Sequence, residues 1–234
     1  MKVAIMQPYI LPYIGYFQLI EAVDTFIVYD KIKYTKKGWI NRNRFLSNGS
    51  DALFSLPLKK DSDFLDIIDR EISPDFAPRK LLNQIKEAYR KAPHLGRTLA
   101  LLEKVLIQDE RNLFRFLQNS LKFTCTHIGI TTPLTTSSTL GVDDNLHAQD
   151  KVIALCGAAG ASTYINPIGG TELYKHDDFD KAGIDLRFLR STSKSYPQLG
   201  GDFVPWLSIL DVLMFNSPEQ VLRMVRTDFE LLMA

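Results

Sequence analysis

A loop rich in polar and aromatic side chains, residues 7–16, follows the first predicted strand. The apolar run at residues 3–6 is typical of a strand buried on both faces, and a helix is expected from residue 15. Free backbone amides at the start of a helix, together with the positive end of its dipole, bind anions such as phosphate. Gly15 would let a phosphate or another backbone approach closely. The substrate-binding candidates here are Gln7, Pro8, Tyr9, Tyr13 and Gly15, and Tyr16 is a catalytic candidate.

The order of strand, loop and helix resembles the start of nucleotidylyltransferases, in which an H-x-G-H motif stands at the first helix. In this chain YIGY occupies that place, at residues 13–16. Tyrosine replaces both histidines, and it donates a hydrogen bond without carrying a positive charge at neutral pH. The replacement therefore argues against adenylyl transfer. The alternative interpretation is an aromatic loop that only fills the core.

A basic segment, residues 31–44, comes after the second predicted strand at residues 25–29. It holds six lysines and arginines together with Tyr34 and Trp39, a composition that suits recognition of an anion and stacking on a base or sugar. Asn41 and Asn43 would share one face of an extended chain and could bind hydroxyl groups. The alternative is a solvated charged surface. The substrate-binding candidates are Lys36, Lys37, Trp39, Asn41, Arg42, Asn43 and Arg44.

The C-terminal half supplies further candidates at predicted strand ends and loops. Asn166, Gly169 and Gly170 follow a strand, although a Gly-Gly pair is also common in plain tight turns. Tyr196 and Gln198 lie in a polar loop that could act as a lid. These five residues are substrate-binding candidates.

Two more residues are catalytic candidates. His147 is the strongest candidate for a general acid or base, because imidazole titrates near neutrality. Asp211 interrupts an apolar run, where a carboxylate must be paired or hydrogen-bonded. It could hold an arginine of the site or cap a neighbouring element.

The elements that must position these residues follow an alternating order. A strand, a helix at residues 15–23 and a second strand predict a parallel β-α-β unit, with ligands at the carboxyl ends of the strands. The order resumes with a helix at residues 149–159, strands at 162–165 and 184–189, and helices at 207–215 and 219–232, the last of which opens at the start signal Ser217-Pro218. Between these two parts, residues 64–126 read as mostly helical. We predict one α/β domain over residues 1–234, with a Rossmann-like, mainly parallel sheet and a helical insertion at 64–126.

Composition excludes several classes of protein. The chain has 234 residues, 45% of them hydrophobic and 24% charged, and a net charge of +1. That balance argues against a nucleic-acid partner, since proteins that bind nucleic acid usually carry a basic excess.

Cys125 and Cys156 lack the spacing of metal ligands, so we expect buried thiols in a reducing compartment and no metal site. The apolar run at residues 3–6 is too short for a signal peptide or a membrane span, so we expect a cytoplasmic protein. No cofactor is identifiable, and an oligomer is possible.

Several motifs together resemble the WbqC-like family. They are MQPY at residues 6–9, PYIGYF at 12–17, GWINRNR at 38–44 and LSILD at 207–211, supported by TYIN at 163–166 and YPQ at 196–198. The resemblance implies a place in the biosynthesis of bacterial surface polysaccharide, notably the O-antigen of lipopolysaccharide. It supplies the pathway rather than the reaction.

Two functions fit these observations. The first is a transferase that adds an acyl or aminoacyl group to a nucleotide-activated sugar or amino sugar, with the lysines and arginines on phosphates and His147 moving a proton. The second is a non-catalytic nucleotide-sugar-binding or scaffold protein of the same pathway, favoured by the lack of a familiar nucleophile. An RNA-binding module rests only on residues 31–44, and the near-neutral charge argues against it.

Overall fold

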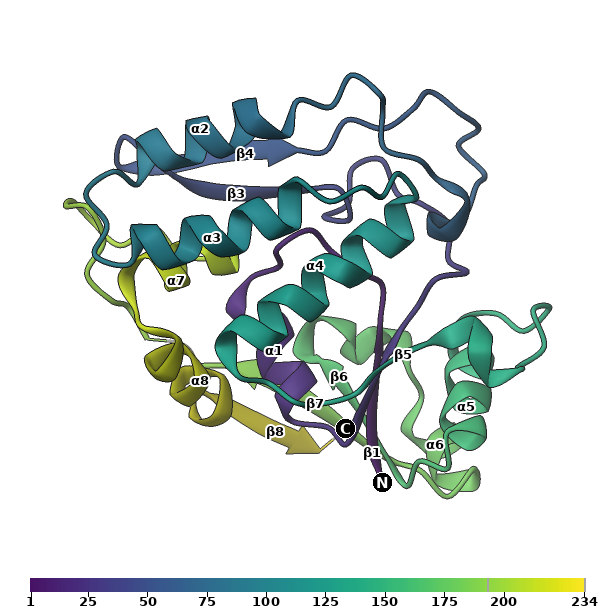
Figure 1. The fold of residues 1–234 in the computed structure, drawn as a ribbon. Coiled ribbons are helices and arrows are strands. Elements are labelled where there is room, and N and C mark those ends of the chain that lie inside the picture. The colour runs from purple at the N-terminus through teal and green to yellow at the C-terminus, as the bar shows by residue number, and fades with distance from the viewer. Residues whose placement is uncertain (193, 234) are drawn as a thin grey trace.

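A six-stranded sheet forms the centre of the protein, as seen in a computed structural model that describes residues 1–192 and 194–233 (Figure 1). The strand order is β5-β2-β1-β6-β7-β8, and every neighbouring pair is parallel except β7 and β8. The predicted α/β class with a Rossmann-like, mainly parallel sheet is therefore confirmed. The first unit is β1 (Lys2–Met6), α1 (Ile14–Glu21) and β2 (Thr25–Val28), which confirms the predicted β-α-β start.

The remaining strands of the sheet come from the second half of the chain. They are β5 (Leu134–Thr136), β6 (Thr163–Pro167), β7 (Asp185–Ser191) and β8 (Phe229–Met233). The helices that accompany them are α5 (Ala148–Ala158), α6 (His176–Lys181), α7 (Ile209–Phe215) and α8 (Pro218–Thr227). Among the described residues, none of the helices combines the length and the apolar character needed to cross a lipid bilayer.

Alternation along the strands divides the core into two layers, one on each face of the sheet. Ala4, Phe26 and Val28 belong to the larger cluster, which also contains residues of α1, α7 and α8. Val3, Ile5 and Ile27 belong to the smaller cluster, together with residues of α5 and α6. Figure 1 shows α5 and α6 beside the sheet at the lower right, and α8 at the lower left. Helices therefore cover both faces of the sheet, as a parallel sheet requires.

A hairpin and three helices lie between β2 and β5 in the sequence. The hairpin is β3 (Arg42–Ser47) and β4 (Ser50–Ser55), and the helices are α2 (Pro78–Ala88), α3 (Leu95–Leu106) and α4 (Leu113–Ile128). Figure 1 shows the hairpin, α2 and α3 together above the sheet, and α4 between them and α1. The larger hydrophobic cluster runs through all of these elements without interruption. A single domain that carries residues 64–126 as an insertion stays a prediction.

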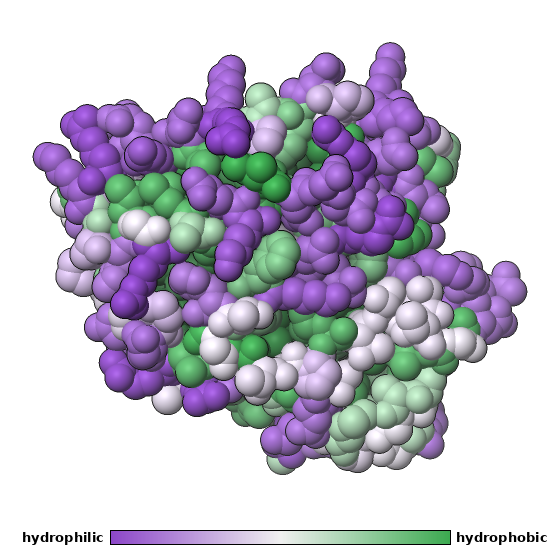
Figure 2. Space-filling view, in the orientation of Figure 1, coloured by the Kyte–Doolittle hydropathy of each residue, from purple (hydrophilic) through white to green (hydrophobic). Residues whose placement is uncertain are grey.

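The outer surface of this upper part is mixed. Figure 2 shows many hydrophilic residues there, interrupted by hydrophobic patches, and residues from white to pale green around α5 and α6 at the lower right. The hydrophilic residues reflect the amphipathic character of the two upper helices, whose apolar residues Leu82, Ile85 and Leu102 point inward.

The predicted end of the last helix, at residue 232, is wrong. Its start at Ser217-Pro218 is confirmed by a capping box, in which the Gln220 amide donates to Ser217 Oγ and the Ser217 amide donates to Gln220 Oε1. The helix ends at Thr227, however, and β8 follows it as an antiparallel strand on β7. Residues 229–233 are apolar enough to form either a buried helix or a strand. The exposed edge of β7 would leave its backbone groups without partners, so pairing with that edge prevails over helix propensity.

Candidate functional site

A cavity of about 1070 Å³ opens where the carboxyl ends of β1, β2 and β6 come together. From β1 the chain proceeds to β2 on one side, whereas β6 pairs with β1 on the other side. This is the point at which the strand order reverses, and open α/β sheets bind their ligands there. Small-molecule pockets usually measure about 300–1,000 Å³. The cavity therefore has room for a ligand with several parts.

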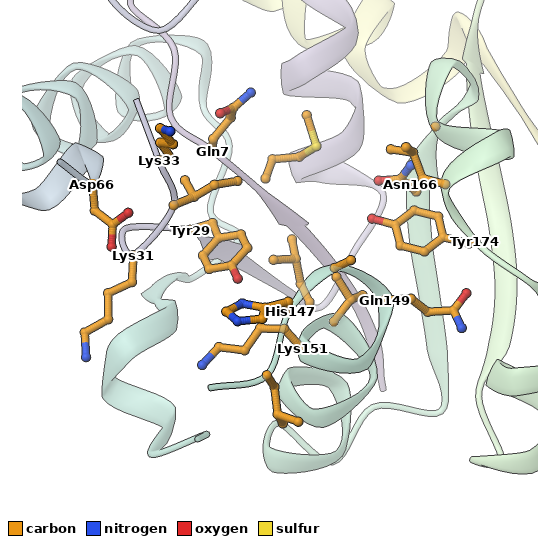
Figure 3. Close-up of a pocket in the computed structure, with 18 of the residues that line it drawn as sticks. Gln7, Tyr29, Lys31, Lys33, Asp66, His147, Gln149, Lys151, Asn166 and Tyr174 are labelled. Carbon is orange, nitrogen blue, oxygen red and sulfur yellow. The ribbon is translucent and has the colours of Figure 1, made fainter. Parts of the chain in front are cut away.

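Polar side chains line this cavity from several elements (Figure 3). Lys31, Lys33 and Asp66 lie on one side, and Asn166 and Tyr174 lie opposite them. Tyr29 and His147 point into the space between. Burial, followed by the nearby carboxylates of Asp66 and Asp144, raises the pKa of the Tyr29 hydroxyl. The hydroxyl therefore keeps its proton at neutral pH and can donate a hydrogen bond to a ligand.

The three lysines of the cavity have different surroundings. Lys151 is buried, and its ammonium donates to the carbonyl oxygens of Val142 at 3.3 Å and Asp143 at 2.6 Å. It holds the loop that leads to His147. Lys31 forms an ion pair with Asp144. The Lys33 ammonium lies 4.4 Å from the centre of the Phe64 ring, and this ring is 80% exposed. Lys31 and Lys33 are thus the cations that a ligand can reach.

The start of α5 forms part of the cavity wall. His147 stands immediately before the helix, and no side chain caps the first amides. Ala148, a lining residue, adopts a left-handed φ of 46°, a conformation that costs a residue with a Cβ about 1 kcal/mol or more. Uncapped amides at the positive end of the helix dipole suit an anion.

Asn166 presents its amide to the cavity in a fixed orientation. The Tyr164 hydroxyl donates to Asn166 Oδ1 at 3.1 Å and lies 3.2 Å from the Tyr174 hydroxyl. Complete burial raises the pKa of Tyr164 well above its ordinary value, so this hydroxyl remains a donor. A Cβ on Gly170 would lie only 2.0 Å from Asn166 Nδ2. Only glycine at position 170 leaves room for the amide, which can donate a hydrogen bond to a ligand.

Substituting Gly170 with alanine should therefore displace the Asn166 amide. We expect a loss of about 1–3 kcal/mol in the free energy of unfolding, the usual cost of overpacking a tight site. Gly169→Ala is the matched control, since a Cβ there meets no atom within 4 Å. Urea denaturation of the two variants measures the difference. Equal stability of both variants would contradict the proposed role of the amide.

The loop between β1 and α1 is held by its neighbours on both sides. Asn43 Nδ2 donates to the carbonyl oxygens of Ile10 at 3.0 Å and Leu11 at 2.8 Å, and Ser208 Oγ donates to the Leu11 oxygen at 2.7 Å. These bonds hold Leu11 in a left-handed conformation with φ of 44°. Tyr16 Oη donates to the Gln7 carbonyl oxygen at 2.9 Å, and burial raises the pKa of this hydroxyl. Within this structure Tyr16 supports the loop from inside the core.

The residues that sequence analysis selected lie in separate places. Those that line the large cavity are Gln7, Tyr9, His147, Asn166, Gly169 and Gly170. Gln7 Nε2 donates to the Tyr9 hydroxyl at 2.8 Å, which joins two of them. Pro8 is buried next to them in the chain, and Gly15 is buried against the Tyr13 ring. The roles assigned to all of these residues stay predictions.

The basic segment lies mainly outside the lining of the large cavity. Lys36 forms an ion pair with Asp63 at 2.8 Å. The guanidinium groups of Arg42 and Arg44 lie 5.6 Å and 5.3 Å from the Trp39 ring. Arg42 also donates to the carbonyl oxygens of Lys37 and Gly38.

The two asparagines of this segment bind protein groups. Asn41 accepts from the Tyr34 hydroxyl at 2.8 Å and donates to the Leu56 oxygen at 2.8 Å. Like Asn43, it is therefore engaged with the protein's own backbone and side chains in this structure.

Asp211 connects a third group of candidates. It is fully buried and accepts hydrogen bonds from Tyr89 at 2.8 Å, Tyr196 at 2.6 Å and Gln198 at 2.7 Å. Burial raises the pKa of this carboxyl, and the three hydrogen bonds oppose the rise. Tyr13 and Tyr196 line a second, smaller cavity of about 280 Å³.

Several residues of the large cavity were not among the named candidates, although Lys31 and Lys33 belong to the basic segment that the sequence indicates for anion recognition. These residues are Tyr29, Lys31, Lys33, Asp66, Gln149, Lys151 and Tyr174. A usable signal was present for three of them. Tyr29, Lys31 and Lys33 alternate directly after β2, so they continue one face of a strand beyond its carboxyl end. The other four come from distant segments that only the fold brings together.

Neither thiol is available for covalent chemistry. Cys125 and Cys156 are both buried and free, and burial raises the pKa of each to about 12. Among residues 1–192 and 194–233, no three His, Cys, Asp or Glu side chains are grouped so that they could hold a metal ion.

A mainly parallel sheet with helices on both faces defines the molecule as an α/β protein, and a polar cavity lies at the switch point of that sheet. The chain belongs to the WbqC-like protein family, whose model matches residues 7–223. It is also 30% identical over 219 residues to the "Uncharacterized protein Rv1507c" of Mycobacterium tuberculosis, covering 92% of this chain and 93% of that protein. No solved structure matches the chain.

Proposed function

We propose that the protein is a transferase that binds a nucleotide-activated sugar in the large cavity and adds an acyl or aminoacyl group to its amino sugar. We place this step in the synthesis of lipopolysaccharide O-antigen, in the cytoplasm, as the resemblance to the WbqC-like family implies for the pathway and as the sequence predicts for the location. The observation that carries the proposal is the position of the cavity. It lies at the carboxyl ends of β1, β2 and β6 and combines reachable cations with hydrogen-bonding side chains.

The diphosphate of the substrate would bind between β2 and α5. Lys31 and Lys33 supply positive charge from one side, and the uncapped amides at the start of α5 supply donors from the other. The exposed Phe64 ring beside Lys33 offers an apolar surface on which a base or sugar can stack. Asn166, with its fixed amide, would then hold a sugar hydroxyl or a carbonyl oxygen on the far side of the cavity.

The transfer itself requires no nucleophile from the protein. The amine of the amino sugar attacks the acyl carbon of an activated donor, a C–N bond forms, and the bond to the leaving group breaks. The proton lost by the amine would pass to the imidazole of His147, which points into the cavity. Direct transfer is consistent with the two buried thiols, whose raised pKa values make them poor nucleophiles.

Substituting Lys33 with glutamine should weaken nucleotide-sugar binding. A charge-assisted hydrogen bond contributes about 1.5–3 kcal/mol, so the Kd for a UDP-, dTDP- or GDP-linked sugar should rise by at least about tenfold. Lys36→Gln is the matched control, since Lys36 belongs to the same segment but pairs with Asp63 outside the cavity. Isothermal titration calorimetry measures both. A larger loss for the Lys36 variant would place the anion site elsewhere, and no binding by the unaltered protein would overturn the proposal.

The alternative is a protein that binds the nucleotide sugar without turnover. The tyrosines at residues 13 and 16 favour it, because they stand where nucleotidylyltransferases have histidines and carry no positive charge at neutral pH. Incubation of the purified protein with a UDP-linked amino sugar and acyl or aminoacyl thioesters, followed by mass spectrometry, separates the two functions. Transfer that is lost in His147→Gln supports the transferase, and tight sugar binding without product with any donor supports the binding protein.

A further inference from the structure

The second cavity has a different chemical character from the first. It measures about 280 Å³ and lies between the start of α1, the segment after β7, and α7 and α8. Aromatic and aliphatic side chains make up most of its lining, and the aromatic ones are Tyr13, Tyr196, Phe203 and Trp206. Among the described residues that line it, Lys194 carries the one charged side chain. An apolar interior with one exposed lysine in its lining suits a small ligand that has an apolar body and an anionic end.

Trp206 is held in an unfavourable conformation beside this cavity. Its φ is 60°, in the left-handed region that a bulky residue rarely adopts, and its side chain is 65% exposed. The indole lies against the Tyr13 ring, with 5.9 Å between the ring centres. Exposure of a large aromatic side chain and local backbone strain both lower the stability of the folded state. Such strain is found most often at functional sites, including segments that clamp a ligand.

The opposite wall is anchored to the core. Tyr196 donates to the buried carboxylate of Asp211 and packs edge-on against Phe203, with 5.1 Å between ring centres. Gln198 donates to the same carboxylate and accepts from the backbone amide of Val204 at 2.9 Å. These contacts fix the segment that carries Phe203 and Val204, so the cavity is formed before any ligand arrives.

We propose that this second cavity binds a short-chain carboxylate, with the alkyl chain among the aromatic rings and the carboxylate near Lys194. The volume is just below the range of about 300–1,000 Å³ for drug-sized ligands, so the cavity has room for a chain of several carbons. Residues 7–14 link this cavity with the large one, since Gln7 and Tyr9 line the first and Tyr13 and Ile14 line the second. This ligand would correspond to the acyl group that the protein transfers, an inference that rests on the proposed function. Binding of a carboxylate in this cavity does not depend on that function.

Tryptophan fluorescence tests this site directly. The chain has two tryptophans, so Trp39→Phe leaves Trp206 as the sole reporter. Titration of this variant with sodium hexanoate should give a saturable change in emission at millimolar concentration or below. Hexan-1-ol should bind at least several-fold more weakly, because it has no charge for Lys194. Lys194→Gln in the same background should remove that preference.

Filling the cavity separates specific binding from surface quenching. Val204→Phe, combined with Trp39→Phe, should abolish the saturable signal, and circular dichroism shows whether the variant is folded. If that variant does not fold, competition between hexanoate and a longer carboxylate in Trp39→Phe takes its place, and weaker binding of the longer chain is expected. No saturable change in Trp39→Phe, or a change unaffected by filling the cavity, would overturn the proposal. Hexanoate binding without any nucleotide-sugar binding would reject the proposed function alone.

Discussion

Substituting Asp211 with alanine should lower the free energy of unfolding by about 3–5 kcal/mol. The Asp211 carboxylate accepts from Tyr89, Tyr196 and Gln198, and the alanine variant leaves these donors without their acceptor. A buried donor that loses its partner costs about 1–3 kcal/mol. The melting temperature should fall by about 10 °C in a protein of this size, as measured by calorimetry.

Tyr196→Phe serves as the graded control for this prediction. It removes one donor and leaves Tyr89 and Gln198 on the carboxylate, so a loss of about 1 kcal/mol is expected. It should also loosen the wall of the small cavity, because Tyr196 lines it. If Asp211→Ala keeps full stability and loses only enzymatic turnover, Asp211 would be catalytic, as the sequence predicts, rather than a support for this wall.

Substituting Asn43 with alanine should destabilise the protein by about 2–4 kcal/mol and weaken binding in the large cavity. The Asn43 amide donates to the carbonyl oxygens of Ile10 and Leu11, and Leu11 has a left-handed φ that these bonds help to maintain. Loss of both bonds leaves two buried acceptors with fewer partners. The loop that carries Gln7 and Tyr9 would then lose its fixed position, which urea denaturation and nucleotide-sugar titration together detect.

The aspartate variant of Asn43 sharpens the test. Asn43→Asp keeps the oxygen that accepts from the Arg44 amide but loses both donated bonds. It should therefore be at least as unstable as the alanine variant. Unchanged stability in both variants with loss of sugar binding would instead support direct contact between Asn43 and the substrate.

Local patterns in the sequence identified much of the fold. The apolar runs at β1 and β2, and the helix start at Ser217-Pro218, are dictated by neighbours along the chain, and the structure confirms them. β8 was not predictable in this way, because its conformation depends on the free edge of β7, which is formed by residues about forty positions earlier.

The candidate site was harder to predict for a related reason. The residue type gives the chemistry of a side chain, but the groups that this side chain contacts often come from distant parts of the sequence. Asn43 has the amide expected of a sugar ligand, yet the fold places it against Ile10 and Leu11. Lys36 and Lys33 are equivalent in the sequence, and only the structure shows that Lys33 lines the large cavity while Lys36 pairs with Asp63.

The segment from Gln7 to Ile14 forms part of the lining of both cavities. If a ligand in one cavity repositioned this segment, the shape of the other cavity would change too, and the two binding equilibria would be interdependent. Thermodynamic linkage then requires the influence to be mutual: if a carboxylate raises the affinity for a nucleotide sugar by some factor, the sugar raises the affinity for the carboxylate by the same factor. Measuring each affinity with and without the other ligand would give the coupling free energy between the two halves of the molecule.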